Sequence, residues 1–106
     1  MATYYWKDLG QPLERMPYAQ AVKWYRADGT LILRSYSTDV CAIHNEWIYC
    51  KGLYSSTTRK HISAFASENG LRYNDFKNFA NSGLWYNVST GEVLTEDEVK
   101  DWCGYI

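Results

Sequence analysis

The sequence predicts an α+β domain, an antiparallel sheet packed on one face by two or three short helices. Strand-like runs interrupted by turn residues fill positions 18–50, and helical patterns are grouped after them. One further strand-like run, "LWYNV", begins at residue 84. We therefore expect the sheet to consist of two N-terminal hairpins plus this later strand.

The length and the charge of the chain limit what this domain can be. A chain of 106 residues has room for one modest core, so we predict a single domain over residues 18–106. Residues 1–17, where Gly10, Pro12 and Pro17 interrupt every period, are predicted to be an N-terminal arm. The net charge of -1 gives no general affinity for nucleic acid, so an electrostatic partner must meet a local patch.

The first hairpin is predicted from Asp28-Gly29, which stands between two apolar-rich runs in "AVKWYRADGTLILRSY". A two-residue turn there would pair Lys23 with Arg34. Successive side chains of a strand point to opposite faces, so this register gives the hairpin a core face and an outer face. The core face would carry Val22, Trp24, Leu31 and Leu33, and the outer face Lys23, Tyr25, Ile32, Arg34 and Tyr36.

The second hairpin is predicted in "DVCAIHNEWIYCKG", with Asn45-Glu46 as its turn. In this register apolar residues oppose apolar residues on one face, which is the agreement that a correct register should give. The predicted pairs are Cys41 with Cys50, Ala42 with Tyr49, Ile43 with Ile48 and His44 with Trp47.

The cysteines predict neither a disulfide nor a metal site. The chain has three, Cys41, Cys50 and Cys103, and no basic-then-apolar leader with a cleavage site, so we expect reduced thiols in a cytoplasm. Two thiols brought together by one hairpin do not complete a structural zinc site, which takes four ligands. We therefore predict no metal and no cofactor.

A helix is predicted to begin within "YSSTTRKHISAFASENG". Ser56 or Thr57 can cap its N-terminus, and Asn69-Gly70 can end it in the left-handed conformation. Its apolar stripe comprises Ile62, Phe65 and Ala66.

Two shorter helices are predicted further along the chain. The first lies in "YNDFKNFANSG", where Asn74 would cap it and Gly83 would end it. The second lies in "TEDEVKDWCG", where Thr95 and Glu98 have the spacing of a capping box.

The phrases that begin at Leu33 and at Tyr54 resemble the motif of a family of small, mostly uncharacterised proteins from bacteriophages and prophages. "LRSYSTDVCAI" and "YSSTTRKHISAFASENG" are similar to S-Y-x-T-x-V-A-x-I followed by Y-S-x-T-T-x-[RK]-H-I-x-x-F. The resemblance extends from Leu33 to Leu71 and implies an origin in a mobile element without implying an activity. The matching positions are Ser35, Tyr36, Thr38, Tyr54, Ser55, Thr57, Thr58, His61, Ile62 and Phe65.

The start of the first helix is a candidate anion site. Free N–H groups at a helix N-terminus, the hydroxyls of Ser56, Thr57 and Thr58 and the guanidinium of Arg59 are groups that bind an anion. The same hydroxyls also serve simply to begin a helix. Arg59 and Lys60 oppose the helix dipole there, a slight penalty that a retained binding patch would also carry. Both interpretations, a helix cap and a grip for a phosphate or an acidic partner, stay open.

No catalytic constellation emerges, and we predict that the protein is not an enzyme. His61, at the border of the apolar stripe, is expected to hydrogen-bond a neighbouring backbone or hydroxyl group. Catalysis by two histidines would require His44 and His61 to converge on one phosphate, and nothing in their spacing requires this. Most acidic residues gather in "TEDEVKD", a helix start that its dipole favours, and no P-loop occurs.

The outer face of the first hairpin is the surface best suited to a partner. It interleaves the cations Lys23 and Arg34 with the rings of Tyr25 and Tyr36. Tyr and Arg are frequent anchors at protein interfaces, and rings with cations also bind single-stranded nucleic acid. A solvated or arm-covered face is the third interpretation.

From these observations we predict a non-enzymatic binding protein of a phage or prophage. Its partner would be a host protein complex, such as a CRISPR effector, that it covers, which would make it an anti-CRISPR or other anti-defence inhibitor. The alternative is a small nucleic-acid-binding protein that uses the basic and aromatic sheet face. A monomer and a homodimer are both compatible with the sequence. The residues predicted to bind the partner are Lys23, Tyr25, Arg34, Tyr36, Arg59 and Lys60.

Overall fold

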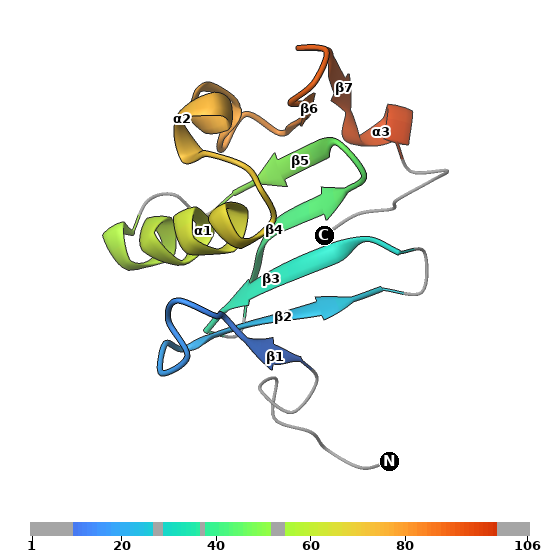
Figure 1. Ribbon diagram of the computed structural model, residues 1–106. Helices are drawn as coiled ribbons and strands as arrows, with labels where there is room; N and C mark the ends of the chain where they lie inside the picture. The colour runs from blue at the N-terminus through green and yellow to red at the C-terminus, as the bar shows by residue number, and fades with distance from the viewer. Residues whose placement is uncertain (1–9, 27–28, 37, 52–54, 100–106) are drawn as a thin grey trace.

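The computed structural model describes residues 10–26, 29–36, 38–51 and 55–99, and its dominant element is a seven-stranded antiparallel sheet (Figure 1). The strands lie side by side in chain order. They are β1 (Gln11–Pro12), β2 (Ala21–Tyr25), β3 (Leu31–Ser35), β4 (Thr38–His44), β5 (Trp47–Cys50), β6 (Leu84–Asn87) and β7 (Val93–Thr95).

The predicted α+β class is wrong, because the sheet dominates the fold and the helices are short. Two strands are missing from the prediction. β1 lies in the segment predicted as an arm, and β7 follows the turn after β6. With two and three residues, neither is long enough for an alternation of faces to appear in the sequence. The helices are α1 (Ser56–Glu68), α2 (Tyr73–Phe76), the 3-10 helix η2 (Lys77–Phe79) and α3 (Glu96–Val99).

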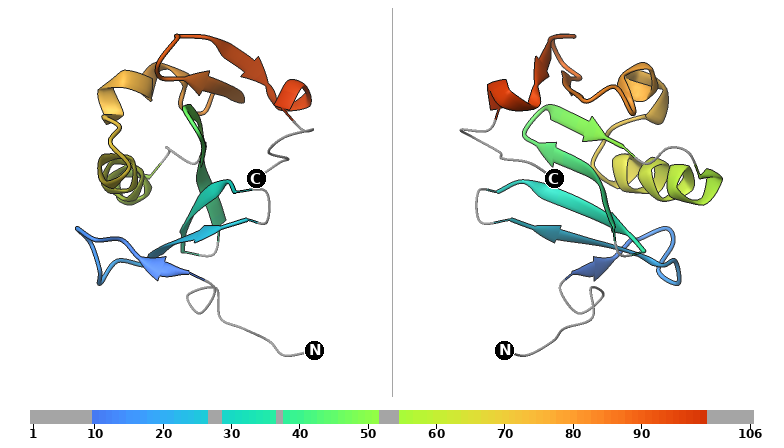
Figure 2. Two further views of the ribbon diagram at one scale, coloured as in Figure 1. Left: turned by 45° about the vertical axis from the view of Figure 1, so that its right-hand side comes forward. Right: turned by 180° about the vertical axis from the view of Figure 1, so that it is seen from behind.

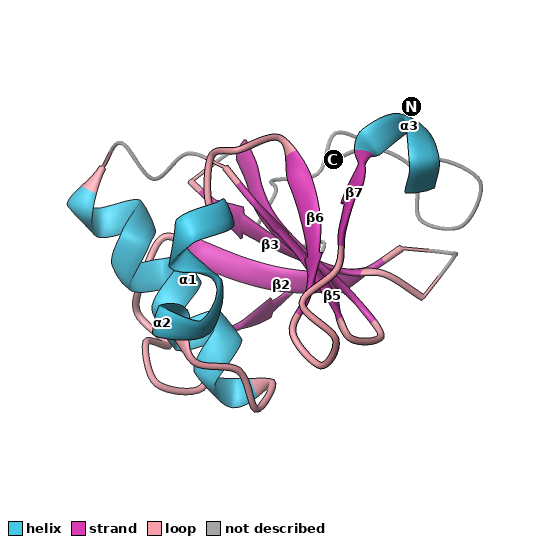
Figure 3. Cartoon of the chain, turned by 90° about the horizontal axis from the view of Figure 1, so that it is seen from above, coloured by secondary structure: helices cyan, strands magenta, loops and turns pink. Residues whose placement is uncertain are grey.

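Helices cover both faces of the sheet rather than one. α1 and α2 lie on one face, and α3 lies on the other (Figures 2 and 3). Each face has its own cluster of buried side chains. The α1 face buries Leu13, Ala21, Leu31, Leu33, Val40, Cys41, Ile48, Cys50, Ile62, Phe65, Ala66 and Phe76. The α3 face buries Ile32, Ala42, Tyr49, Trp85 and Val99.

The register predicted for the second hairpin is confirmed. β4 and β5 pair Cys41 with Cys50, and the following pairs run in step to His44 and Trp47. Asn45 has a φ of 55°, the left-handed conformation that tight hairpin turns require and that asparagine tolerates.

The register predicted for the first hairpin is wrong by one residue. β2 and β3 pair Lys23 with Leu33 and Trp24 with Ile32. The loop is closed by Arg26 and Thr30, whose backbone N–H and carbonyl are 2.9 Å apart, and Gly29 has a φ of 88°. Three residues therefore separate the closing pair, as in hairpins that end on a left-handed glycine, and not the two that we predicted. Asp28 itself lies outside the described residues.

The helix α1 follows the predicted stripe, but its N-cap lies one residue before Ser56 and two before Thr57, the two caps that the sequence predicts. Ser55 is its N-cap, and the side chain of Ser55 accepts a hydrogen bond from the backbone N–H of Thr58 at 3.4 Å. Gly70, just beyond the helix, has a φ of 78°, as predicted for a left-handed helix end. The side chains buried by α1 are Thr58, His61, Ile62, Phe65 and Ala66.

Of the two later helices, α2 is shorter than the sequence suggests, and the end of α3 lies outside the described residues. α2 begins after Arg72, without a side-chain cap, so the predicted cap at Asn74 is wrong. α3 does begin with the predicted capping box: Oγ1 of Thr95 accepts from the N–H of Glu98 at 3.3 Å, and Oε1 of Glu98 accepts from the N–H of Thr95 at 3.2 Å.

The N-terminal segment is built into the fold from Gly10 onward. β1 pairs with β2, and the side chain of Leu13 is fully buried in the α1-face cluster. A Cβ atom on Gly10 would lie 2.5 Å from the carbonyl oxygen of Lys23, so only glycine allows this approach. The segment predicted as an arm therefore contributes both a strand and a core side chain.

Candidate functional site

The residues predicted to form one outer sheet face are distributed over both faces of the sheet. In the observed register Lys23 pairs with Leu33, and Arg34 pairs with Val22. Neighbouring residues of a strand point to opposite faces, so Lys23 lies on the α1 face and Arg34 on the α3 face. The single basic and aromatic sheet face that the sequence predicts does not exist in this register.

Lys23 is held inside the fold. Its Nζ donates a hydrogen bond to Oε1 of Glu68 and lies 3.9 Å from Glu14. The side chain of Lys23 is 17% exposed and that of Glu68 is 3% exposed. Oε2 of Glu68 also accepts the backbone N–H of Glu14 at 3.0 Å. These contacts fasten the N-terminal segment, β2 and α1 to one another.

Arg34 is also occupied by neighbours in its own molecule. Its Nε and Nη2 donate to the two carboxylate oxygens of Asp39 at 2.7 and 3.3 Å. Its Cζ lies 5.5 Å from the ring centroid of Trp24, within cation–π distance. A β-bulge between β3 and β4 brings Asp39 opposite Arg34, because the pairing steps from Cys41 to Asp39 and leaves Val40 without a partner.

The two predicted tyrosines are both exposed but stand apart. Tyr25 pairs with Leu31 at one end of the hairpin, whereas Tyr36 follows the last pair at the other end. Tyr36 has a φ of 56°, and its N–H donates to the carbonyl oxygen of Gln20 at 2.6 Å. Its ring centroid is 6.0 Å from that of His61.

The residues of the candidate anion site at the start of α1 do not all lie on the same side of the helix. Ser56, Thr57 and Arg59 are exposed, whereas Thr58 is buried beneath the helix. Ser55 already accepts the N–H of Thr58. The predicted residues thus point in different directions around the first turn, and Tyr54, which precedes them, lies outside the described residues.

The two histidines face opposite sides of the sheet. Nδ1 of His61 is 2.8 Å from Oγ of Ser35 on the α1 face, which confirms the predicted bond to a hydroxyl group. His44 shares the α3 face of its strand with Ala42, and its Nδ1 is 3.0 Å from Oγ1 of Thr30. Burial lowers the pKa of His61 below its usual 6.5. His44 and His61 therefore do not converge on one site.

Arg59 and Lys60 do contribute to a concave surface, on the outer side of α1. A hollow of about 660 Å³ lies between the loop that leads into β2, the helix α1 and the helix α2. A second hollow of about 300 Å³ continues from it toward the start of α1. These elements follow one another along one side of the molecule in Figure 1. We call the combined surface the basic groove; it is lined by Arg15, Met16, Arg59, Lys60, Ser63, Ala64, Ser67, Leu71, Arg72, Tyr73 and Asn74.

The shape of the basic groove follows from the helical repeat. Residues three or four apart share one side of a helix, and here Lys60, Ser63 and Ser67 lie opposite the buried stripe. Small side chains on this side leave a depression, and long side chains from the loop and from α2 form its walls. Apolar side chains of Met16, Ala64 and Leu71 pack against the α1-face cluster beneath it.

The basic groove carries an excess of positive charge. Of its four cations, Arg72 forms an ion pair with Asp75 at 3.5 Å. Within the described part of the chain, no carboxylate lies at ion-pair distance from Arg15, Arg59 or Lys60. The first turn of α1 also contains no acidic residue that would complement the helix dipole. The groove is therefore electrostatically suited to an anionic or acidic partner.

Sequence reasoning identified two of the four cations. The spacing of Lys60, Ser63 and Ser67 does indicate an exposed side of small residues on the helix. Arg15 and Arg72, however, reach the groove from a loop and from the start of α2. Only the tertiary packing brings these segments beside α1.

No group of three metal-ligating side chains occurs among the residues that the structure describes. Cys41 and Cys50 are free and buried, and Cys103 lies outside the described residues. In the same part of the chain, no helix is long and apolar enough to cross a membrane.

The fold and the groove together define a small antiparallel-sheet protein with a basic hollow on its surface. The chain belongs to a family of unknown function, DUF8033, whose match extends over residues 12–81. The match includes every residue that lines the basic groove as well as the Ser35–His61 pair. No curated protein and no solved structure matches the chain.

Proposed function

We propose that this protein is a non-enzymatic binding protein that attaches to an acidic, partly apolar surface of a protein complex through the basic groove. The observation that supports this proposal is the combination of an apolar floor with basic walls in one hollow. Removing apolar area from water supplies affinity, whereas the cations select carboxylates and accelerate encounter. A patch that offered charge alone would bind weakly and lose its partner as salt rises.

The interface must extend beyond the groove, because a stable protein interface buries roughly 800 Å² per partner. Tyr18 stands on the same loop as Arg15 and Met16, and this residue is 96% exposed. A tyrosine presents a large ring at low entropic cost, so Tyr18 is the residue that we expect to anchor the edge of the interface.

The biological role that we propose rests on the resemblance of residues 33–71 to bacteriophage and prophage proteins. A phage protein that covers a host complex would act by occluding the site where that complex binds nucleic acid or assembles. We therefore propose an anti-CRISPR or other anti-defence inhibitor, with a CRISPR effector as the first host complex to test.

The alternative function, binding of nucleic acid, is favoured by one observation, the unpaired cations of the groove. The sheet gives this alternative little support, because Lys23 and Arg34 lie on opposite faces and each has an acidic partner. Among the residues that line the basic groove, Tyr73 is the only aromatic ring on which a base could stack.

A pull-down with a matched pair of variants tests the proposal. Tagged protein is incubated with a lysate of its bacterial host, with and without nuclease, and bound proteins are quantified by mass spectrometry. We expect a stoichiometric protein partner that survives nuclease and whose affinity falls at least about tenfold for Arg15→Glu/Lys60→Glu. Lys77→Glu, an exposed cation outside the groove, is the control and should bind as the wild type does.

Two results would overturn the proposal. Loss of every partner on nuclease treatment, with salt-dependent binding of oligonucleotides, would establish the alternative function. A partner retained equally by the wild type and by Arg15→Glu/Lys60→Glu would place the interface elsewhere on the molecule.

A further inference from the structure

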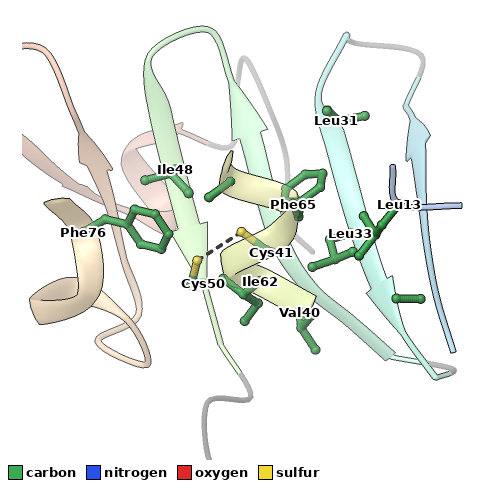
Figure 4. Close-up of a cluster of buried hydrophobic side chains, with 12 residues drawn as sticks. Leu13, Leu31, Leu33, Val40, Cys41, Ile48, Cys50, Ile62, Phe65 and Phe76 are labelled. Atoms are coloured by element: carbon green, nitrogen blue, oxygen red, sulfur yellow. Dashed lines mark hydrogen bonds between the residues drawn. The ribbon is translucent and has the colours of Figure 1, made fainter. Parts of the chain in front are cut away.

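We propose that Cys41 and Cys50 form a reversible disulfide across the β4–β5 hairpin, which makes this pair a redox modification site within the α1 face. The two sulfur atoms are 3.0 Å apart, and both thiols are free (Figure 4). This separation is only about 1 Å longer than the ~2.05 Å of a disulfide bond.

The backbone at this pair suits a disulfide. Cys41 and Cys50 are directly opposite in the hairpin. The N–H of Lys51 donates to the carbonyl oxygen of Val40 at 2.8 Å, so the adjacent pair is the hydrogen-bonded one. Cys41 and Cys50 therefore form a non-hydrogen-bonded pair, whose Cα atoms are typically about 4.5 Å apart. That distance falls within the roughly 4.4–6.8 Å range of natural disulfides, so the sheet need not rearrange.

The surroundings of the pair control when it reacts. Cys41 is 0% exposed and Cys50 is 3% exposed, beneath Ile62 and Phe65 of α1 and beside Phe76 (Figure 4). Burial, and secondly the hydrogen bond with Cys50, raises the pKa of the Cys41 thiol. Because the thiolate is the reactive form, oxidation is slow while α1 is in place and accelerates when α1 opens.

The reaction needs an oxidant of the class of small disulfides, such as oxidised glutathione. The thiolate of one cysteine attacks the small disulfide, forms a mixed disulfide and releases one small thiolate. The thiolate of the second cysteine then attacks the protein sulfur of the mixed disulfide and releases the second. The protein dithiol loses two electrons and two protons, and the small disulfide is reduced to two thiols.

The proposed bond is independent of the proposed function, because neither sulfur lines the basic groove. Its expected effect is on stability. Closing the loop from Cys41 to Cys50 restricts the unfolded chain, so we expect Tm to rise by about 5 °C or more on oxidation.

The test uses the full chain with Cys103→Ser, so that only this pair can react. The protein is incubated with oxidised glutathione, without urea and at urea concentrations below the unfolding midpoint, and is then alkylated and analysed by intact mass and peptide mapping. We expect loss of the mass of two hydrogen atoms, a peptide that links Cys41 to Cys50, reversal by dithiothreitol and a faster reaction in urea. Cys50→Ala in the same background should give only the glutathione adduct.

Three outcomes would overturn the inference. Both thiols could remain open to alkylation at every urea concentration below the midpoint. Glutathione adducts or linked dimers could accumulate in place of the internal bond. A Tm that falls on oxidation would mean that the native backbone does not accommodate the disulfide. Because the linkage is read on the Cys103→Ser protein itself, the test does not depend on the folding of Cys50→Ala.

Discussion

The two faces of the sheet are buried by different means. The α1 face lies under a helix of 13 residues and holds mainly aliphatic side chains and the two thiols. The α3 face lies under a helix of which four residues are described, and its centre is aromatic, with the ring centroids of Tyr49 and Trp85 5.4 Å apart. Its polar groups are less well matched, because the buried Nε1 of Trp24 has no hydrogen-bond partner in the described part of the fold.

This difference indicates that the two faces have different roles in the molecule. The α1 face has the larger cluster, and α1 separates that cluster from the basic groove on its outer side. The helix that lines the groove is therefore also the helix that covers this cluster. The α3 face completes the burial of β3, β4 and β5 without contacting the groove. The predictions below test this asymmetry.

The largest effect is expected from Phe65→Ala, which empties the centre of the α1 face. Phe65 is fully buried, and removal of such a ring costs about 3–5 kcal/mol of unfolding free energy. Val99→Ala on the α3 face removes a smaller buried side chain and should cost about 2 kcal/mol. Urea unfolding of both variants measures the two values. If Val99→Ala cost as much as Phe65→Ala, the α1 face would not be the main core.

A second prediction concerns the charged contact at the edge of the α1 face. Glu68→Ala removes the partner of Lys23 and the acceptor of the Glu14 N–H, and should cost about 2–3 kcal/mol. Adding Lys23→Met should recover part of this loss, because no cation is then left without its partner. The wild type, the two single variants and the double variant are compared by urea unfolding. Strict additivity of the two substitutions would mean that Lys23 and Glu68 do not interact.

A third prediction addresses the N-terminal cap of α3, the helix that covers the α3 face. Thr95→Ala removes the hydroxyl that accepts the N–H of Glu98 and should cost about 1 kcal/mol. Thr95→Ser keeps an acceptor at this position and should stay close to the wild type. Thermal unfolding distinguishes the two. Equal losses for both variants would attribute the effect to the methyl group of Thr95 and not to the cap.

The two hairpins explain how far the sequence could predict the sheet. On one face of β4–β5, apolar residues oppose apolar residues, so a wrong register would have placed unlike residues together. In β2–β3 both faces are buried, and Ile32 and Leu33 are equally apolar, so neither register conflicts with the pattern. The prediction then depended on the Asp-Gly turn alone, and Gly29 serves the longer loop as well.

The candidate site was predictable only in its local part. The exposed side of α1, with Arg59 and Lys60, follows from the helical repeat. Arg15 joins it because β1 pairs with β2 and Leu13 enters the core, and neither event leaves a periodic signal in so short a segment. Arg34 is absent from the site because the register of β2 and β3 places it on the α3 face, and a β-bulge that the sequence does not mark brings Asp39 opposite it.

The smallest effect in this series is the pH dependence of the α1 face. Burial lowers the pKa of His61 below 6.5, so the folded state disfavours the protonated imidazole. Above pH 6.5 His61 is mostly neutral in both states and its contribution to stability is complete. As the pH falls below 6.5, the unfolded chain binds the proton first and stability is lost.

The matched variant for this prediction is His61→Gln, which retains a side-chain amide near Oγ of Ser35 but cannot titrate. Unfolding free energies of the wild type and the variant are compared between about pH 7 and pH 5.5, above the range in which most carboxylates titrate. We expect the stability advantage of the wild type to shrink as the pH falls within this window. Parallel curves for the two proteins would mean that His61 takes up its proton equally well in the folded state, and hence that α1 does not seal this part of its face from water.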